Sequence, residues 1–439
     1  MYHRDAVGLS LTGASQTGVV AYQRAQRELQ CFVGDPVASV DQAIAADPGF
    51  VMAHVLKGYL YGLSTERDAM AIAQSAHRAA AALGGTSRER SHVAALGQLA
   101  TGGWHEASRI LAELTTDEPR DALALQAGHQ IDFFTGDAPM LRDRIARAMP
   151  AWSDEMAGYH AIVGMQAFGL EEMGDYAHAE ALGRQAVALE PRDGWAQHAV
   201  AHVMEMQSRQ QDGIVWMRSN TDNWTKDSFF QTHNWWHLAL FHYELGDIEA
   251  ARDLFDGPIF GKPNSVVFNM VDASALLWRL HLGGHDLGDR WSALAANWMP
   301  KAKDGNYAFN DVHAMMAFVG AGLVGPARDL LEAQQHAMQG SDDNARFTRD
   351  IGHPLVLALQ AFGEGRYGEA IRLIEPLRAI AHRFGGSHAQ RDVIELTLIE
   401  AALRSGNDAL ASSLSAARMA ARPESPLSAL FVRRADFSV

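Results

Sequence analysis

The chain has a single cysteine, Cys31, among its 439 residues, so no disulfide can form within it. A lone cysteine is most often a buried free thiol, and chains without disulfides are typical of reducing compartments. The first residues also lack the cationic start and apolar stretch of a secretory signal. We therefore predict a cytoplasmic protein whose one thiol is free and buried.

Long apolar runs and basic clusters are missing as well. The longest apolar run, residues 314–325, contains three glycines and is too short to cross a bilayer. The formal net charge is −15, and no Lys/Arg-rich run offsets it locally, so the chain should repel phosphate backbones. Neither a membrane nor nucleic acid is expected as a partner.

Familiar catalytic motifs are absent too. The sequence contains no Gly-x-Ser-x-Gly elbow, no His-Glu-x-x-His pair and no glycine-rich phosphate loop after a strand. Cys31 has no catalytic partner near it in the sequence, and Ser387 beside His388 is the one candidate nucleophile of note. Any chemistry must come from a less familiar arrangement.

A repeating turn is the main feature that is present. Turns followed by an acidic or alanine-rich helix start recur at spacings of 33, 38, 35, 37, 38, 41, 40 and 41 residues. Spacing of this kind is typical of a helical solenoid. The turn markers are Gly103, Gly136, Gly174, Arg209, Gly246, Gly284, Gly325, Gly365 and Gly406, of which Arg209 replaces a missing glycine.

Prolines divide the units further. Pro119, Pro191 and Pro423 follow their turn glycines by 16 or 17 residues, which predicts two helices of about 12 to 15 residues per unit. We predict an all-α, tetratricopeptide-like, right-handed α-solenoid that forms a single domain over residues 1–439, with about nine to eleven helix pairs. Longer polar connections are expected at residues 218–231, 256–269, 299–310 and 339–353, where they could form a binding mouth.

Polar, histidine-rich phrases fall at one register of this repeat, in the helix before each turn. His198, His202 and Glu205 have i, i+4 and i+7 spacing, and His233 and His237 form a second i, i+4 pair one unit later. The phrases are densest in residues 150–320. The candidate catalytic residues are His198, His202, Glu205, His233, His237, Asp311, His313, His388 and Asp392.

Three interpretations of these residues remain open. The two histidine pairs could hold zinc, iron, manganese or copper, with Glu205, Asp272 or Asp311 completing the ligand set. Without a metal, the same groups could serve as acids and bases around an organic ligand. The candidate ligand-binding residues are then Asn234, Trp235, Trp236, Asp272, Gln390 and Arg391. The third interpretation is that the histidines are hydrogen-bonded packing residues at helix crossings.

Several strings also resemble a known family. They include Asp5-Ala-Val-Gly-Leu-Ser-Leu, His198-Ala-Val-Ala-His-Val-Met-Glu-Met, Thr232-His-Asn-Trp-Trp-His-Leu-Ala-Leu and Gly385-Gly-Ser-His-Ala-Gln-Arg-Asp. In these strings, which span nearly the full length, the chain resembles the family of tetratricopeptide repeat protein 38. The resemblance implies an all-helical repeat array but no particular activity.

Two classes of function therefore remain. The loops and the Asn234-Trp-Trp block favour a concave pocket that binds and transforms a small organic molecule by acid/base or metal-assisted chemistry. The alternative is a scaffold that binds a peptide or partner protein in its groove. Self-association through a terminal repeat is plausible for either class. Whether the protein is an enzyme is left open by the sequence.

Overall fold

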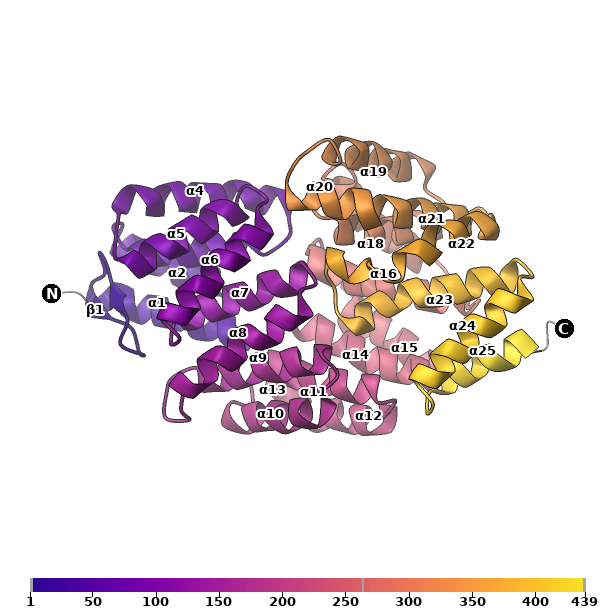
Figure 1. Cartoon of the computed structure of the whole chain (residues 1–439), viewed down its shortest axis with the longest axis horizontal. Coiled ribbons are helices and arrows are strands. Elements are labelled where there is room, and N and C mark those ends of the chain that lie inside the picture. The colour runs from indigo at the N-terminus through magenta and orange to yellow at the C-terminus, as the bar shows by residue number, and fades with distance from the viewer. Residues whose placement is uncertain (1–2, 263, 437–439) are drawn as a thin grey trace. The chain divides into compact units, whose positions relative to one another are not determined.

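The computed structural model describes residues 3–262 and 264–436, which are almost entirely helical (Figure 1). The strands within these residues are β1 (His3–Arg4) and β2 (Ser10–Leu11), which pair in antiparallel fashion with His3 opposite Leu11. The all-α prediction is confirmed. None of the described helices is both long and apolar enough to span a membrane.

The helices form two compact units. The first unit contains residues 3–200 and 220–231, and the second contains residues 201–219, 232–262 and 264–436. The boundary falls inside one continuous helix, α11 (Gly194–Met206). The existence of a single solenoid domain stays a prediction.

The first unit is built from consecutive helices that pack on one another. Helix α3 packs against both α4 and α5, and α6 against both α7 and α8, as expected when each helix pair covers the next. Its helices are α1 (Gln16–Cys31), α2 (Pro36–Ala46), α3 (Val51–Gly62), α4 (Arg67–Leu83), α5 (Ser87–Leu99), α6 (Trp104–Asp117), α7 (Ala122–Phe134), α8 (Ala138–Ala148), α9 (Tyr159–Glu172), α10 (Tyr176–Leu189), the start of α11, and α13 (Thr221–Thr225).

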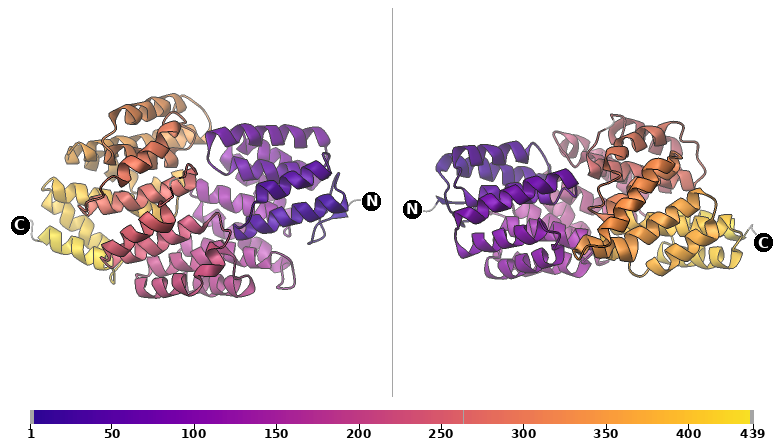
Figure 2. Two further views of the ribbon diagram at one scale, coloured as in Figure 1. Left: turned by 180° about the vertical axis from the view of Figure 1, so that it is seen from behind. Right: turned by 90° about the horizontal axis from the view of Figure 1, so that it is seen from above.

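The second unit has contacts that a simple neighbour-to-neighbour array lacks. Helix α23 packs on α16, where Trp278 Nε1 donates to Thr397 Oγ1 at 3.0 Å and the Arg279 guanidinium donates to the Ala389 carbonyl at 2.6 Å. Figure 2 shows the ribbons from behind and from above. The helices are the end of α11, α12 (Gln210–Ser219), α14 (Gln231–Glu244), α15 (Ile248–Leu254), α16 (Val267–Leu282), α17 (Arg290–Trp298), α18 (Ala308–Gly320), α19 (Val324–Ala337), α20 (Asp343–Phe347), α21 (His353–Gly363), α22 (Tyr367–Ile374), α23 (His388–Arg404), α24 (Asp408–Ala421) and α25 (Pro426–Asp436).

The repeating turns are found where the spacing places them, with one correction. Gly136, Gly174 and Gly246 adopt left-handed φ angles of 67°, 81° and 77°, a conformation in which a side chain would clash. The turn without glycine uses Ser208 at φ 55°. The assignment of Gly325 as a turn marker was wrong, because α19 begins at Val324 and the left-handed residue is Gly322.

The proline punctuation is confirmed. Pro119, Pro191 and Pro423 each lie between two helices, and the helices that they separate are mostly 13 or 14 residues long. The polar connections are not plain loops, however. Residues 218–231 contain α13, and the other three contain short turns of 3-10 or π-helix at Phe255–Ile259, Met299–Lys301 and Thr348–Gly352.

Replacing two helical glycines with alanine should change the free energy of unfolding in opposite directions. A Cβ on Gly169 of α9 would lie 2.7 Å from the Arg142 Cα of α8, whereas a Cβ on Gly325 of α19 would meet nothing within 4 Å. Gly169→Ala should therefore lower the free energy of unfolding by about 1 to 3 kcal/mol. Gly325→Ala should raise it by about 0.5 to 1 kcal/mol through helix propensity. Urea denaturation of both variants measures the difference, and equal effects would contradict the close approach of α8 and α9.

Candidate metal centre

Four buried histidines meet where helices α11 and α14 lie together. His198 and His202 are one turn apart on α11, and His233 and His237 are one turn apart on α14. Each is at most 3% exposed, and one ligand nitrogen from each lies within 4.8 Å of the others. His202, His233 and His237 belong to the second unit, and His198 lies on the same helix as His202 but within the first unit.

Two of these rings are held by buried carboxylates. His233 Nδ1 contacts both oxygens of Asp272, at 2.9 and 3.0 Å, and His237 Nδ1 contacts Glu205 Oε2 at 3.0 Å. A proton on each Nδ1 donates to the carboxylate. Carboxylates bind metal-ligating histidines in this way, since the contact fixes the tautomer and the ring orientation.

Burial also favours the neutral form that a metal requires. It lowers the pKa of His237 well below its usual value, and the neighbouring His202, His233 and Arg279 lower it further. Burial also raises the pKa of Asp272, and it raises that of Glu205 to about 7. His237 is therefore kept as a neutral donor.

Aromatic side chains also pack against the ring of His233. Trp236 is fully buried and stacks on His233 with ring centroids 5.3 Å apart and planes 20° apart. Phe268 lies 5.2 Å from the same ring, and the Arg279 guanidinium lies 5.4 Å from the Trp236 centroid. The histidines consequently have little freedom to leave the cluster.

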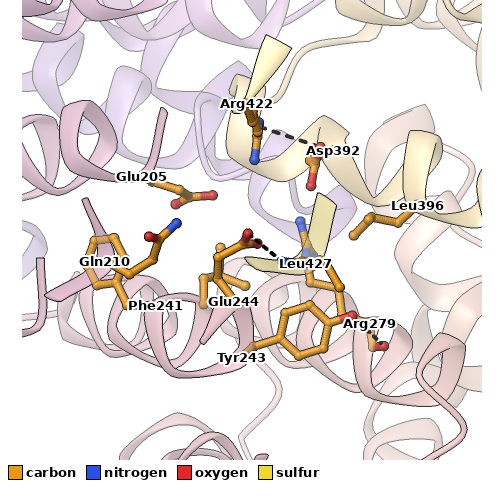
Figure 3. A pocket seen from close by; sticks show the side chains of 11 residues that line it. Glu205, Gln210, Phe241, Tyr243, Glu244, Arg279, Asp392, Leu396, Arg422 and Leu427 are labelled. Carbon is orange, nitrogen blue, oxygen red and sulfur yellow. Dashed lines mark hydrogen bonds and ion pairs between the residues drawn. The ribbon is translucent and has the colours of Figure 1, made fainter. Parts of the chain in front are cut away.

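A small polar cavity of about 20 Å³ adjoins the cluster through Glu205 (Figure 3). Glu205, Glu244, Arg279, Asp392 and Arg422 point their charged groups toward it. A water needs about 10 to 15 Å³ of such space. The cavity is therefore large enough for water but too small for an organic molecule as the side chains stand.

A larger hollow of about 440 Å³ lies on the surface of the same unit. It is lined by Met206–Arg209 at the end of α11 and by residues 421–424 at the end of α24. Arg422 lines both this hollow and the inner cavity, and its guanidinium lies 3.6 Å from Asp392 Oδ1. Arg422 is therefore the side chain between the hollow and Glu205.

Three other candidate catalytic residues have partners of their own. Asp392 pairs with Arg418 at 2.6 and 3.0 Å, and the arginines around it hold its pKa far below the usual range despite burial. Asp311 accepts from Gln334 Nε2 at 3.2 Å. His313 Nδ1 contacts the Phe309 carbonyl at 2.8 Å, and its ring packs on Phe309. Asp392 also lines the small cavity together with Glu205.

The residues around His388 form the start of helix α23. Ser387 accepts from Gln390 N–H at 3.2 Å, and the Gln390 side chain accepts from Ser387 N–H at 3.0 Å, which is a capping box. Arg391 donates to the Gly386 carbonyl. Ser387 and Gln390 thus begin a helix, and the expectation that Ser387 is a nucleophile finds no support. Of the remaining ligand-binding candidates, Asn234 is fully buried and Trp235 is half-buried on α14.

Sequence reasoning missed Arg279 and Glu244. Arg279 lies in the stretch Trp278-Arg-Leu-His281, which is typical of a packed core. It is indeed only 2% exposed, but it also lines the small cavity. A buried arginine in an apolar helix was the available signal. Glu244 carried no signal, because its partner Ser425 is 181 residues away.

The donor set itself fits a transition metal. Clustered imidazoles suit zinc, copper, iron or nickel. A tetrahedral zinc needs about 3.3 Å between its nitrogens, and the ligand nitrogens here lie within 4.8 Å of one another. No family model matches the chain, and the resemblance to the tetratricopeptide repeat protein 38 family therefore stays a prediction.

The buried carboxyl of Asp311 should make stability depend on pH. Burial raises the pKa of Asp311 from 3.8 to about 7. Its stabilising contribution is complete below the unfolded pKa and is lost as pH rises through the folded one. Asp311→Asn should therefore have a higher melting temperature than wild type at pH 8 and the same melting temperature at pH 4. At pH 8 its free energy of unfolding should exceed that of wild type by at most about 4 kcal/mol. Thermal melts at both pH values check this, with the more exposed Asp329→Asn as control.

Proposed function

We propose that His202, His233 and His237, joined by His198, hold a divalent transition metal that serves chemistry on a small organic molecule. The observation that carries the proposal is the pair of carboxylate contacts at His233 Nδ1 and His237 Nδ1. These contacts fix the two rings, and one ligand nitrogen of each lies within 4.8 Å of one from His198 and one from His202. That arrangement favours a ligand set over simple packing.

The chain's own residues have distinct tasks in this proposal. Asp272 and Glu205 orient the ligand rings and offset the charge of the ion. A bound divalent ion would supply Lewis acidity toward an oxygen of the substrate. Arg279 and Arg422, on the cavity side of Glu205, would attract an anionic or strongly polar group.

The surface hollow is the proposed entrance. Its volume of about 440 Å³ lies within the range of about 300 to 1,000 Å³ for small-molecule pockets. A substrate would contact Arg422 and displace it from Asp392 to reach Glu205. The proposed framework around this site is a tetratricopeptide-like, right-handed solenoid of the family of tetratricopeptide repeat protein 38.

Elemental analysis tests the metal directly. Protein purified without chelator, and apoprotein titrated with zinc, should each bind about one ion per chain. The His202→Ala/His237→Ala double variant should bind none, because it loses a ligand from each helix. The control is His54→Ala/His178→Ala, which removes two histidines outside the cluster and should leave binding unchanged.

Circular dichroism of the double variant separates loss of ligands from loss of fold. A folded wild-type protein that takes up no zinc, copper, iron, manganese or nickel would overturn the proposal. A scaffold that binds a peptide would then be the hypothesis to pursue, by peptide-array binding.

A further inference from the structure

A second group of reactive side chains lies in the first unit. Cys31 Sγ is 4.0 Å from His160 Nε2, and His160 Nδ1 is 2.7 Å from Asp193 Oδ2. Cys31 ends α1, His160 lies in the first turn of α9, and Asp193 precedes α11. The order is nucleophile, base and orienting carboxylate, as in covalent acyl transfer.

Hydrogen bonds hold the Asp193 carboxylate in place. Its Oδ1 accepts from Ala196 N–H at 2.9 Å and caps α11, while Oδ2 holds His160. The carboxylate is fully buried, and the His160 side chain is 12% exposed. His160 is thus held with Nε2 toward sulfur, which is the tautomer that can accept a proton.

The thiol needs such a base. Burial raises the pKa of Cys31, which is 3% exposed, and the nearby Asp193 and Glu190 raise it further. The group is therefore a thiol rather than a thiolate at neutral pH. A contact of 4.0 Å is long, but catalytic hydrogen bonds are often long before substrate binds.

A cavity of about 10 Å³ lies beside these three residues. Asp193 lines it directly, together with Gln30 and Phe32 on either side of Cys31 and with Ala161 after His160. Its volume fits about one water as the side chains stand, so an acyl group can enter only when they move.

Two buried polar atoms on its wall point to a ligand. His129 is 1% exposed, and its Nδ1 contacts the Leu141 carbonyl at 3.3 Å, while its Nε2 has no hydrogen-bond partner among the described residues. Trp195 Nε1 also finds no acceptor among them. A buried acceptor and a buried donor on one cavity wall are costly unless a guest pairs with them. The carbonyl end of a small acyl group could accept from Trp195.

We propose that Cys31, His160 and Asp193 form an acyl-transfer site that moves a small acyl group from an activated ester or thioester to water. The Cys31 proton passes to His160 Nε2 as sulfur attacks the carbonyl carbon, and the bond to the leaving group breaks. The leaving alcohol or thiol takes that proton. Water then gives a proton to His160 while its oxygen attacks the Cys31 thioester. The carbon–sulfur bond breaks, sulfur regains the proton, and the acid leaves.

The test uses p-nitrophenyl acetate with the full chain. Wild-type protein should release p-nitrophenolate, carry an acetyl group on the Cys31 peptide in mass spectrometry, and turn over slowly. Cys31→Ala should lose both signals. His160→Gln should be acylated at least about 100-fold more slowly, because a general base contributes about that much or more. Asp193→Asn keeps an oxygen for the α11 cap and should also slow acylation, and p-nitrophenyl octanoate should react poorly because the cavity is small.

The matched control is His178→Gln, because the exposed His178 also pairs with an aspartate, Asp175, at 2.8 Å. It should acylate at the wild-type rate. Acylation that is equally fast in His160→Gln, or that falls on lysines instead of Cys31, would overturn the proposal. Circular dichroism confirms that each variant is folded, and wild-type protein unfolded in urea shows the rate of an ordinary thiol.

Discussion

The Asp272→Asn variant should bind zinc about 10-fold to 100-fold more weakly than the wild-type protein. Asp272 is fully buried and contacts His233 Nδ1 through both oxygens, so asparagine removes the charge that faces the ion and one of two acceptors. Asparagine keeps the shape of the side chain, and the fold should persist. Competition with a chelating dye measures the dissociation constant.

Asp247→Asn is the matched control for this change. Asp247 contacts His242 Nδ1 at 2.9 Å in the same manner, but His242 lies outside the cluster. Its zinc affinity should equal that of wild type. If both asparagine variants bind zinc as wild type does, the carboxylate at His233 does not support a metal ligand.

The Asp121→Ala variant should lose about 3 to 5 kcal/mol of unfolding free energy, the cost of breaking a buried ion pair. Asp121 is 1% exposed, and its Oδ2 accepts from Arg88 at 2.7 Å and contacts His92 at 3.0 Å. Its Oδ1 caps α7 by accepting from Ala124 N–H at 3.0 Å. Alanine leaves the Arg88 charge buried without its partner. Urea denaturation at neutral pH measures the loss.

Asp121→Asn separates charge from capping, since it keeps an oxygen for Ala124 N–H. It should cost less than alanine. Burial opposes ionisation of Asp121, but His92 and Arg88 outweigh it and lower its pKa. Stability from this group is therefore present above the unfolded pKa and is lost as pH falls through the folded one. The difference between wild type and Asp121→Asn should shrink in acid, and a constant difference would contradict the ion pair.

Repeat spacing and breaker residues carried most of the fold prediction. Turn glycines and prolines act through φ and through the missing N–H of proline, which are local properties, so the helix boundaries around Pro119 and Pro191 followed from the sequence. The misplaced turn at Gly325 has the same origin. Gly322 and Gly325 are three residues apart, and only the backbone shows which of them is left-handed.

The contact of α23 with α16 was not predictable from spacing. Trp278 and Thr397 are 119 residues apart, and no local pattern relates them. Packing between distant helices depends on how small rotations accumulate along the chain. For the same reason the spacing could not show which partners Asp311, His313 and Asp392 would meet, although all share one register of the repeat.

The sequence by itself determined which side chains share a helix face, because 3.6 residues per turn places His198 with His202 and His233 with His237. Only the tertiary structure decided which acids and bases meet them. Glu205 reaches His237 across 32 residues, Asp272 reaches His233 across 39, and Cys31 reaches His160 across 129. Helix periodicity is a local property of the backbone, whereas these contacts exist because burial of apolar faces brings separate helices together.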